Sequence, residues 1–271
     1  MSAAPAAPAS ELVRRDDDGG VVTLTLATPR NRNALGLAMI DTLTVAFADI
    51  ARDEKARVVV LAGEGPALSG GHNLREMQAR RNDPDRGHEY YEHLMARCSV
   101  LMQAIVALPK PVIAAVEGIA TAAGCQLVAA SDLAVAGESA RFALPGVDIG
   151  LFCSTPLVAV GRAVSRKSAM ELALTGAPVD ARRAEAMGLV NRVVPAGEAL
   201  VHAQALAAGI AARSRAVVAL GKRTFQRQIE TSLADAYRLA SQAMVENLEL
   251  ADATEGIDAF LAKRAPRWTG K

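Results

Sequence analysis

Aromatic residues are scarce in this chain, which has one Trp, three Tyr and five Phe among its 271 residues. Proteins that bind single-stranded nucleic acid stack its bases on aromatic side chains, so no such platform is expected here. The formal net charge is only +1, which gives no general attraction for nucleic acid or for an anionic membrane surface. No apolar run approaches the roughly 20 residues of a membrane-spanning helix. We therefore expect neither a nucleic-acid partner nor a membrane partner.

Cysteine is also rare. Cys98, Cys125 and Cys153 are scattered along the chain without the spacing of a metal site. We expect free thiols, no metal centre and a reducing compartment, which corresponds to a cytoplasmic protein. Residues 1–10 are rich in Ala and Pro and lack the charged start and apolar segment of a secretory signal. Residues 1–12 are expected to form a disordered tail.

Aliphatic residues are abundant, and their spacing predicts an α/β protein. Short apolar runs at residues 21–26, 58–62 and 112–116 are typical of buried strands, and helical spacing follows at 37–53 and 94–107. From residue 199 onward only helices are predicted, at 201–213, 216–229, 232–249 and 252–264, the last beginning with a capping-box-like Asp252-Ala-Thr-Glu255. The pattern predicts an α/β core at residues 13–198 and an all-helical oligomerisation region at 199–271.

Residues 111–135, PVIAAVEGIATAAGCQLVAASDLAV, contain the most informative local pattern. An apolar strand leads into the small-residue loop 118–124, and a helix follows. The first N–H groups of a helix have no partner within it, and the helix dipole adds partial positive charge there. Small side chains allow a ligand to approach this backbone. The loop therefore favours a site for a developing oxyanion, and a tightly packed strand–helix junction without a ligand explains it equally well.

A similar pattern occurs about 50 residues earlier. A strand at 58–62 precedes the glycine-rich loop GEGPALSGG at 63–71, after which a helix begins within residues 72–78. The two stretches ALSGGHNLREM and AVEGIATAAGCQLVAASD are followed by FALPGVDIGL and by LALTGAPVDARRAEAMGLVNRVV. In type and order these motifs resemble the crotonase (enoyl-CoA hydratase/isomerase) superfamily, from about Val21 to Trp268. The stretches TAAGCQLVA, PGVDIGLFCSTP and SQAMVENL resemble its "enoyl-CoA hydratase domain-containing" subgroup.

The resemblance implies a spiral of ββα turns, a helical trimerisation region and a homotrimer or hexamer that acts on acyl-CoA thioesters. It implies that the backbone N–H groups of His72 and Ala123 form an oxyanion hole. Coenzyme A would be part of the substrate, with no permanently bound cofactor. Its contacts are implied at Gly71 and Arg75, and at Phe260 and Lys263, which match residues that reach the coenzyme A of a neighbouring subunit in some members. For Arg75 and Lys263 a solvated helix face is an equal alternative.

The chain departs from the superfamily where enoyl-CoA hydratases have two acid/base glutamates. Those positions match Gln126 and Gly146, and neither residue can accept a proton. Asp148 is a candidate replacement, because in an extended segment it would face the same side as Gly146; a carboxylate that only bonds the backbone is the alternative. The side chain of His72 is a second candidate, with a structural role as its alternative.

Three functions remain open. The first is an acyl-CoA enzyme with unusual acid/base groups, acting as a hydratase, isomerase, decarboxylase or thioesterase. The second is a decarboxylase that needs little beyond enolate stabilisation. The third is a non-catalytic acyl-CoA-binding protein that keeps the fold. Ordinary two-glutamate hydration is not expected.

Overall fold

The computed structural model describes residues 12–271. The predicted disordered tail therefore lies outside the described residues except for Leu12, whose carbonyl accepts a hydrogen bond from the amide of Ala27 at 2.8 Å.

Two sheets form the centre of the molecule. The larger has the order β1-β2-β3-β5-β7-β10 and the smaller the order β4-β6-β8-β9. The larger sheet contains β1 (Val13–Asp18), β2 (Val21–Leu26), β3 (Val58–Gly63), β5 (Val112–Val116), β7 (Leu133–Gly137) and β10 (Arg192–Val194). The smaller contains β4 (Ala67–Ser69), β6 (Ile119–Thr121), β8 (Arg141–Ala143) and β9 (Val179–Asp180). All pairs are parallel except β1 with β2 and β8 with β9.

The chain passes repeatedly from the larger sheet to the smaller one. It does so from β3 to β4, from β5 to β6 and from β7 to β8, and helical structure follows each pair. This repetition is the ββα spiral that the resemblance implies, and it confirms the predicted fold class. It also brings the loops that leave β4 and β6 to the same edge of the smaller sheet, because these two strands are parallel neighbours.

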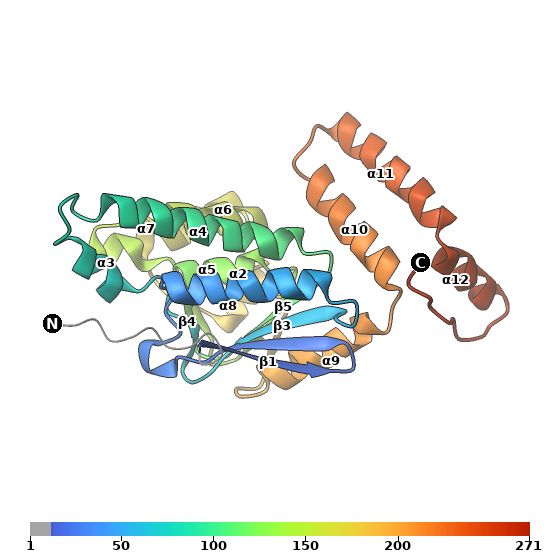
Figure 1. The fold of residues 1–271 in the computed structure, drawn as a ribbon, viewed down its shortest axis with the longest axis horizontal. Helices are drawn as coiled ribbons and strands as arrows, with labels where there is room; N and C mark the ends of the chain where they lie inside the picture. The colour runs from blue at the N-terminus through green and yellow to red at the C-terminus, as the bar shows by residue number, and fades with distance from the viewer. Residues whose placement is uncertain (1–11) are drawn as a thin grey trace.

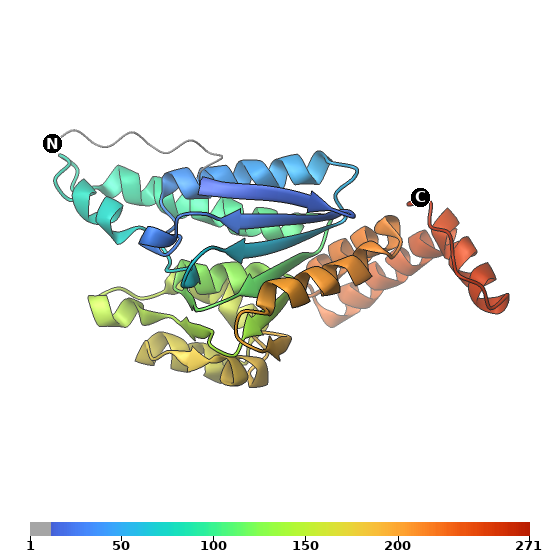
Figure 2. The ribbon, with the colours of Figure 1, turned by 90° about the horizontal axis from the view of Figure 1, so that it is seen from below.

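Helices cover both faces of the larger sheet (Figures 1 and 2). On one face lie α2 (Leu37–Arg52) and α4 (His88–Ala107), and on the other lies α9 (Ala199–Ala211). Successive side chains of a strand point to opposite faces, so Val59 packs in the core beneath α2 while Val58 packs with α9. The buried residues of α9 are alanines four residues apart, such as Ala203 and Ala207, which lets this helix lie close to the sheet.

The other helices surround the smaller sheet or extend from the body. They are η1 (Pro29–Asn31), α3 (Leu74–Arg80), α5 (Ala123–Ala130), η2 (Pro145–Ile149), α6 (Ser154–Ala163), α7 (Arg166–Thr175), α8 (Ala181–Ala186), α10 (Arg215–Gln228), α11 (Leu233–Glu249) and α12 (Ala251–Leu261). Only α10, α11 and α12 project from the body (Figure 1). Helix α9, although it lies beyond residue 198, packs in the core against the larger sheet.

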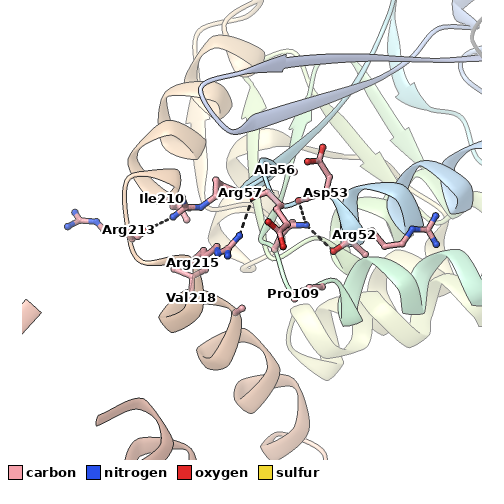
Figure 3. A pocket seen from close by; sticks show the side chains of 13 residues that line it. Arg52, Asp53, Ala56, Arg57, Pro109, Ile210, Arg213, Arg215 and Val218 are labelled. Carbon is pink, nitrogen blue, oxygen red and sulfur yellow. Dashed lines mark hydrogen bonds between the residues drawn. The ribbon is translucent and has the colours of Figure 1, made fainter. Parts of the chain in front are cut away.

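Polar contacts fasten the junction between α9 and α10 to the body. Arg57 donates to the carbonyl of Arg213 at 2.6 Å, and Arg215 donates to the carbonyl of Glu54 at 3.3 Å (Figure 3). Further along α10, the ammonium of Lys222 lies 2.6 Å from the carboxylate of Asp132. These contacts set the direction in which α10 leaves the core.

Several local predictions were wrong. The expected loops at 63–71 and 118–124 contain the short strands β4 and β6, and the charged strand β1 was not anticipated. The predicted capping box is absent: Asp252 lies inside α12 and accepts hydrogen bonds from the backbone amides of Thr269 and Gly270 at 2.6 and 2.8 Å.

No helix within residues 12–271 is both long and apolar enough to cross a bilayer.

Candidate active site

The loops that follow β4 and β6 are packed directly against each other. Thr121 donates from its hydroxyl to the carbonyl of Gly70 at 3.2 Å. A Cβ at Gly124 would lie 2.1 Å from the carbonyl oxygen of Ser69, and a Cβ at Gly71 would lie 3.3 Å from the amide nitrogen of Ala123. Only glycines allow this approach, so the backbone around His72 lies beside the first residue of α5.

Both predicted oxyanion donors are free of protein acceptors within residues 12–271. His72 and Leu35 form a parallel bridge, but its two hydrogen bonds are made by Gly71 and Asn73, the residues on either side of His72. The amide of Leu35 donates to the carbonyl of Gly71 at 2.8 Å, and the amide of Asn73 donates to the carbonyl of Leu35 at 3.4 Å. This leaves the amide of His72 without an acceptor. Ala123 is the first residue of α5, and its amide has no intrahelical partner. Two adjacent loops thus present uncommitted N–H groups.

The backbone before Ala123 is strained. Ala122 has φ 50° and ψ −119°, a conformation that costs a residue with a Cβ about 1–3 kcal/mol. The surrounding contacts hold it there, since the amide of Ala122 donates to the carbonyl of Ala143 at 2.9 Å. Such strain is concentrated at functional sites. Here it turns the chain from β6 into α5 and orients the peptide group between residues 122 and 123.

Asn33 fixes β4 and the segment before it, which lead into the loop at His72. The sequence analysis did not identify this residue. Its side chain is fully buried and donates to the carbonyls of Glu64 and Ala67 at 3.0 and 2.8 Å. The backbone carbonyl of Asn33 accepts a hydrogen bond from the hydroxyl of Ser69 at 2.9 Å. Asn33 has a positive φ of 53°, a conformation that Asn tolerates better than most residues. The polar turn PRNRNALG was visible in the sequence, but its buried contacts lie more than 30 residues away.

Two buried side-chain atoms lack any hydrogen-bond partner in the described part of the chain: Nε2 of His72 and Oε1 of Gln126. Burial lowers the pKa of His72, opposed by the hydrogen bond to Leu35, whose carbonyl lies 3.1 Å from Nδ1. The ring is therefore neutral at pH 7, with its proton on Nδ1. Buried polar atoms in native proteins are usually satisfied, so unpaired ones point to water or a ligand.

The position of Gly146 is filled by Cys153. A Cβ at residue 146 would lie 2.9 Å from the sulfur of Cys153 and 3.0 Å from the carbonyl oxygen of Leu151. Burial raises the pKa of Cys153, opposed by a hydrogen bond from the backbone of Gly146. Burial, with a smaller effect from Cys153, raises the pKa of Cys125 to about 12. Both thiols are protonated at neutral pH, so neither cysteine is a proton acceptor comparable to a glutamate.

The geometric argument for Asp148 does not hold. Residues 145–149 form the 3₁₀ helix η2 rather than the expected extended segment, so Asp148 and Gly146 do not share a face by alternation. The side chain of Asp148 is exposed and lies near Gly176, where a Cβ would be 3.0 Å from its carboxylate.

Comparison with known proteins identifies the family of this chain. The family model described as enoyl-CoA hydratase/isomerase matches residues 16–271. The enoyl-CoA hydratase domain-containing protein 3 of Rattus norvegicus is 47% identical over 270 residues, which cover 99% of this chain and 88% of the relative.

The chain belongs to the enoyl-CoA hydratase/isomerase family.

Solved structures of the family extend the similarity to three dimensions. An enoyl-CoA hydratase from Mycobacterium smegmatis has a TM-score of 0.90 and 52% identity, covering 95% of this chain and 98% of its own. The human enoyl-CoA hydratase domain-containing protein 3 also has a TM-score of 0.90, with 45% identity over 95% of this chain and 100% of its own. The predicted resemblance to the domain-containing subgroup is thus confirmed.

The residues expected to contact coenzyme A are not brought together in one chain of this family member. Arg75 is exposed on α3, beside the first loop. Phe260 is 83% exposed on α12, and Lys263 follows that helix. Figure 1 shows α3 and α12 at opposite ends of the molecule. The segment that carries Phe260 and Lys263 therefore lies at the other end of the chain's fold from α3. Within residues 12–271 no cluster of His, Cys, Asp or Glu has the arrangement of a metal site.

The helix predicted at residues 94–107 begins earlier in the structure than the sequence pattern indicated. Helix α4 begins at His88, and two tyrosines tie its first turn to α3. Tyr90 donates to the carboxylate of Glu76 at 3.0 Å, and Tyr91 donates to the carbonyl of Met77 at 2.9 Å. These side chains thus support the helix that follows the first loop.

Proposed function

We propose that the protein acts on acyl-CoA thioesters, as its family does, and that the amides of His72 and Ala123 stabilise the thioester oxygen as it becomes enolate-like. The observation that carries this proposal is the pair of uncommitted N–H groups on two loops in direct contact. Fixed backbone donors of this kind contribute about 3–4 kcal/mol each to a developing oxyanion. Coenzyme A is the carrier of the substrate, with Gly71 and Arg75 beside it.

The two-glutamate hydration mechanism is not part of this proposal. Gln126 is neutral, and Cys153 occupies the space beside Gly146 with a protonated thiol. Adding water to an enoyl group requires a base that takes a proton from water. Neither residue performs that step at neutral pH.

The same observation favours decarboxylation of a malonyl-type thioester as a second candidate. In that reaction the bond between the α-carbon and the carboxylate breaks, carbon dioxide leaves, and the electron pair moves to the thioester oxygen. The α-carbon then takes a proton from solvent. The protein needs to hold an oxyanion but needs no group that removes a proton, which agrees with Gln126 and Gly146.

The oxyanion role is tested by removing one N–H without changing a side chain. Incorporation of lactic acid in place of Ala123 replaces the amide with an ester and keeps the methyl group. With a thioester labelled with ¹³C at its carbonyl carbon, the unmodified protein should shift the carbonyl resonance downfield, and the ester variant should reduce that shift. An equal shift in both proteins, with folding confirmed by circular dichroism, argues against the role of Ala123.

Activity assays separate the reactions. We expect weak or absent hydration of crotonyl-CoA, followed by loss of its absorbance, and release of carbon dioxide from methylmalonyl-CoA if decarboxylation is the reaction. Crotonyl-CoA turnover comparable to that of an ordinary hydratase would contradict the proposal about the missing base. Acyl-CoA binding with neither reaction supports the non-catalytic alternative.

We also propose that the chain assembles as a homotrimer or hexamer through α10–α12. These helices have large apolar side chains in water, among them Tyr237 at 70%, Phe260 at 83% and Leu261 at 73% exposure. Exposed apolar patches of this kind mark interaction surfaces. A neighbouring copy would also bring its Phe260 and Lys263 to a site they do not reach in their own chain. Light scattering coupled to size-exclusion chromatography measures the copy number.

A further inference from the structure

A cavity of about 280 Å³ lies where α10 leaves the body, and positively charged side chains are prominent in its lining (Figure 3). One wall is the turn between α2 and β3, and the opposite wall is the start of α10. The volume is at the small end of the range for ligand sites, which suits a ligand of few atoms. Two carboxylates line the cavity, against five cations: Arg52, Arg57, Lys110, Arg213 and Arg215.

The side chains of three of these cations bond only to backbone carbonyls within residues 12–271. Arg57 reaches from the body to the carbonyl of Arg213 at 2.6 Å, and Arg215 reaches back to the carbonyl of Glu54 at 3.3 Å (Figure 3). Lys110 donates to three carbonyls at the C-terminal end of α2. A carbonyl accepts a hydrogen bond but does not neutralise a full positive charge. Among these residues, no ion pair therefore balances the three cations.

The two carboxylates of the lining leave positive charge in excess. Asp53 is paired with Arg15, which does not line the cavity, and Glu54 is exposed. Burial lowers the pKa of Lys110, and Asp53 opposes this effect. The positive charges of Arg215 and Arg15 lower that pKa further. An anion bound among these cations would relieve their mutual repulsion, because an opposite charge favours the charged form of each group.

The arginines and the first turn of α10 supply donors that suit an anion. A guanidinium carries five N–H groups, and Arg57 and Arg215 each use only one of them within the described residues. Arg215 is the first residue of α10, and Val218 and Ala219 of the same helix also line the cavity. A helix N-terminus adds partial positive charge, and planar guanidinium groups bind phosphate oxygens in pairs. The lining therefore favours a phosphate group.

This cavity is separate from the candidate active site. It lies at the C-terminal end of α2, whereas Leu35, which bridges to His72, lies just before the N-terminal end of that helix. The 16 residues of α2 span about 24 Å. A small ligand in the cavity therefore does not contact the oxyanion loops.

We propose that the cavity binds a phosphate group, as inorganic phosphate or as a small phosphate monoester, between Arg57 of the body and Arg215 of α10. The phosphate bridges the two guanidinium groups, and Lys110 adds positive charge beside it. Because the bridge joins the body to the projecting helices, the bound anion fixes the direction in which α10 leaves the core. Binding requires no acyl-CoA, so this inference is independent of the proposed function.

Calorimetry with inorganic phosphate and with glycerol 3-phosphate, in chloride at constant ionic strength, tests the proposal. The unmodified protein should bind at least one of them. Arg215→Gln should weaken that binding about tenfold or more, because a hydrogen bond from a charged donor is lost. Arg166→Gln is the matched control: Arg166 is also the exposed first residue of a helix that follows a capping serine, and it does not line the cavity. It should bind like the unmodified protein.

A second variant, Arg57→Gln, removes the donor on the opposite wall and should weaken binding to a similar extent, with folding confirmed by circular dichroism. Tighter binding of glycerol 3-phosphate supports a monoester as the ligand, and tighter binding of inorganic phosphate supports the free anion. Absence of binding by either ligand, or equal affinity in Arg215→Gln and the unmodified protein, overturns the proposal. If Arg215→Gln changes the copy number measured by light scattering, the cavity is an interface between copies and the assignment is wrong.

Discussion

The Cα of Gly124 faces the carbonyl oxygen of Ser69 so closely that a Cβ at residue 124 would lie 2.1 Å from that oxygen. Both atoms belong to the backbone, and neither has a flexible side chain that moves aside. The contact joins the loop after β4 to the first turn of α5. The relative position of the amides of His72 and Ala123 therefore depends on the absence of one methyl group.

Gly124→Ala should separate these loops. We expect a loss of about 1–3 kcal/mol in the free energy of unfolding, because overpacking a rigid contact costs that much, together with loss of acyl-CoA binding. Urea unfolding and calorimetry measure the two effects. Gly209→Ala is the matched control: Gly209 is exposed in α9, and nothing lies within 4 Å of its added Cβ. It should stabilise the protein by about 0.5–1 kcal/mol. Equal stability of the two variants would contradict the role of the close contact.

Restoring the two glutamates should need a third substitution. Gln126→Glu with Gly146→Glu supplies both carboxylates, but a side chain at 146 meets the sulfur of Cys153 at 2.9 Å. We therefore expect the double variant to unfold at lower urea concentration than the unmodified protein. Adding Cys153→Ala should recover part of that stability and give more crotonyl-CoA hydration than the double variant. Equal hydration rates in folded double and triple variants would show that Cys153 is not the obstacle.

The C-terminal segment should detach from α12 in acid. Burial of Asp252 opposes its ionisation, but hydrogen bonds from Ser214 and Thr269 outweigh burial and lower its pKa to about 2. A folded pKa below the unfolded value of about 3.9 means that the ionised carboxylate stabilises the folded segment above pH 4. That contribution is lost as the pH falls from about 4 to about 2. Glu255, whose pKa is also lowered to about 2 by its hydrogen bond from Arg264, acts in the same direction.

The single tryptophan of the chain reports this change. Trp268 packs against Gly256, where a Cβ would lie 3.2 Å from its ring. Its emission should shift to longer wavelength between pH 4 and pH 2 while circular dichroism still shows helices. Asp252→Asn should show the shifted emission already at neutral pH, whereas Asp258→Asn, at an exposed position of the same helix, should behave like the unmodified protein. Unchanged Trp268 emission over that pH range would disprove the link between Asp252 and this segment.

The candidate site was only partly predictable. The motifs around His72 and Ala123 identified both loops, because small residues between a strand and a helix have a local signature. Gln126 and Gly146 were recognised as departures from the family pattern. Cys153 was expected only to be a free thiol, and nothing in the sequence indicated that its sulfur fills the space beside Gly146. The error for Asp148 arose from assuming an extended segment where the chain forms a 3₁₀ helix. Both depend on contacts between segments, which periodicity does not encode.

The sequence by itself determined the α/β class, the family, the positions of most long helices and the two glycine-containing loops. Each of these follows from hydrophobic periodicity or from residues that only certain backbone conformations tolerate. The tertiary structure decided which segments meet. It placed α9 in the core, formed the three-residue strands β4 and β6 through pairing with each other, and placed α10 beside a cleft in the body. These features depend on contacts between residues far apart in the chain, and local pattern contains no information about such contacts.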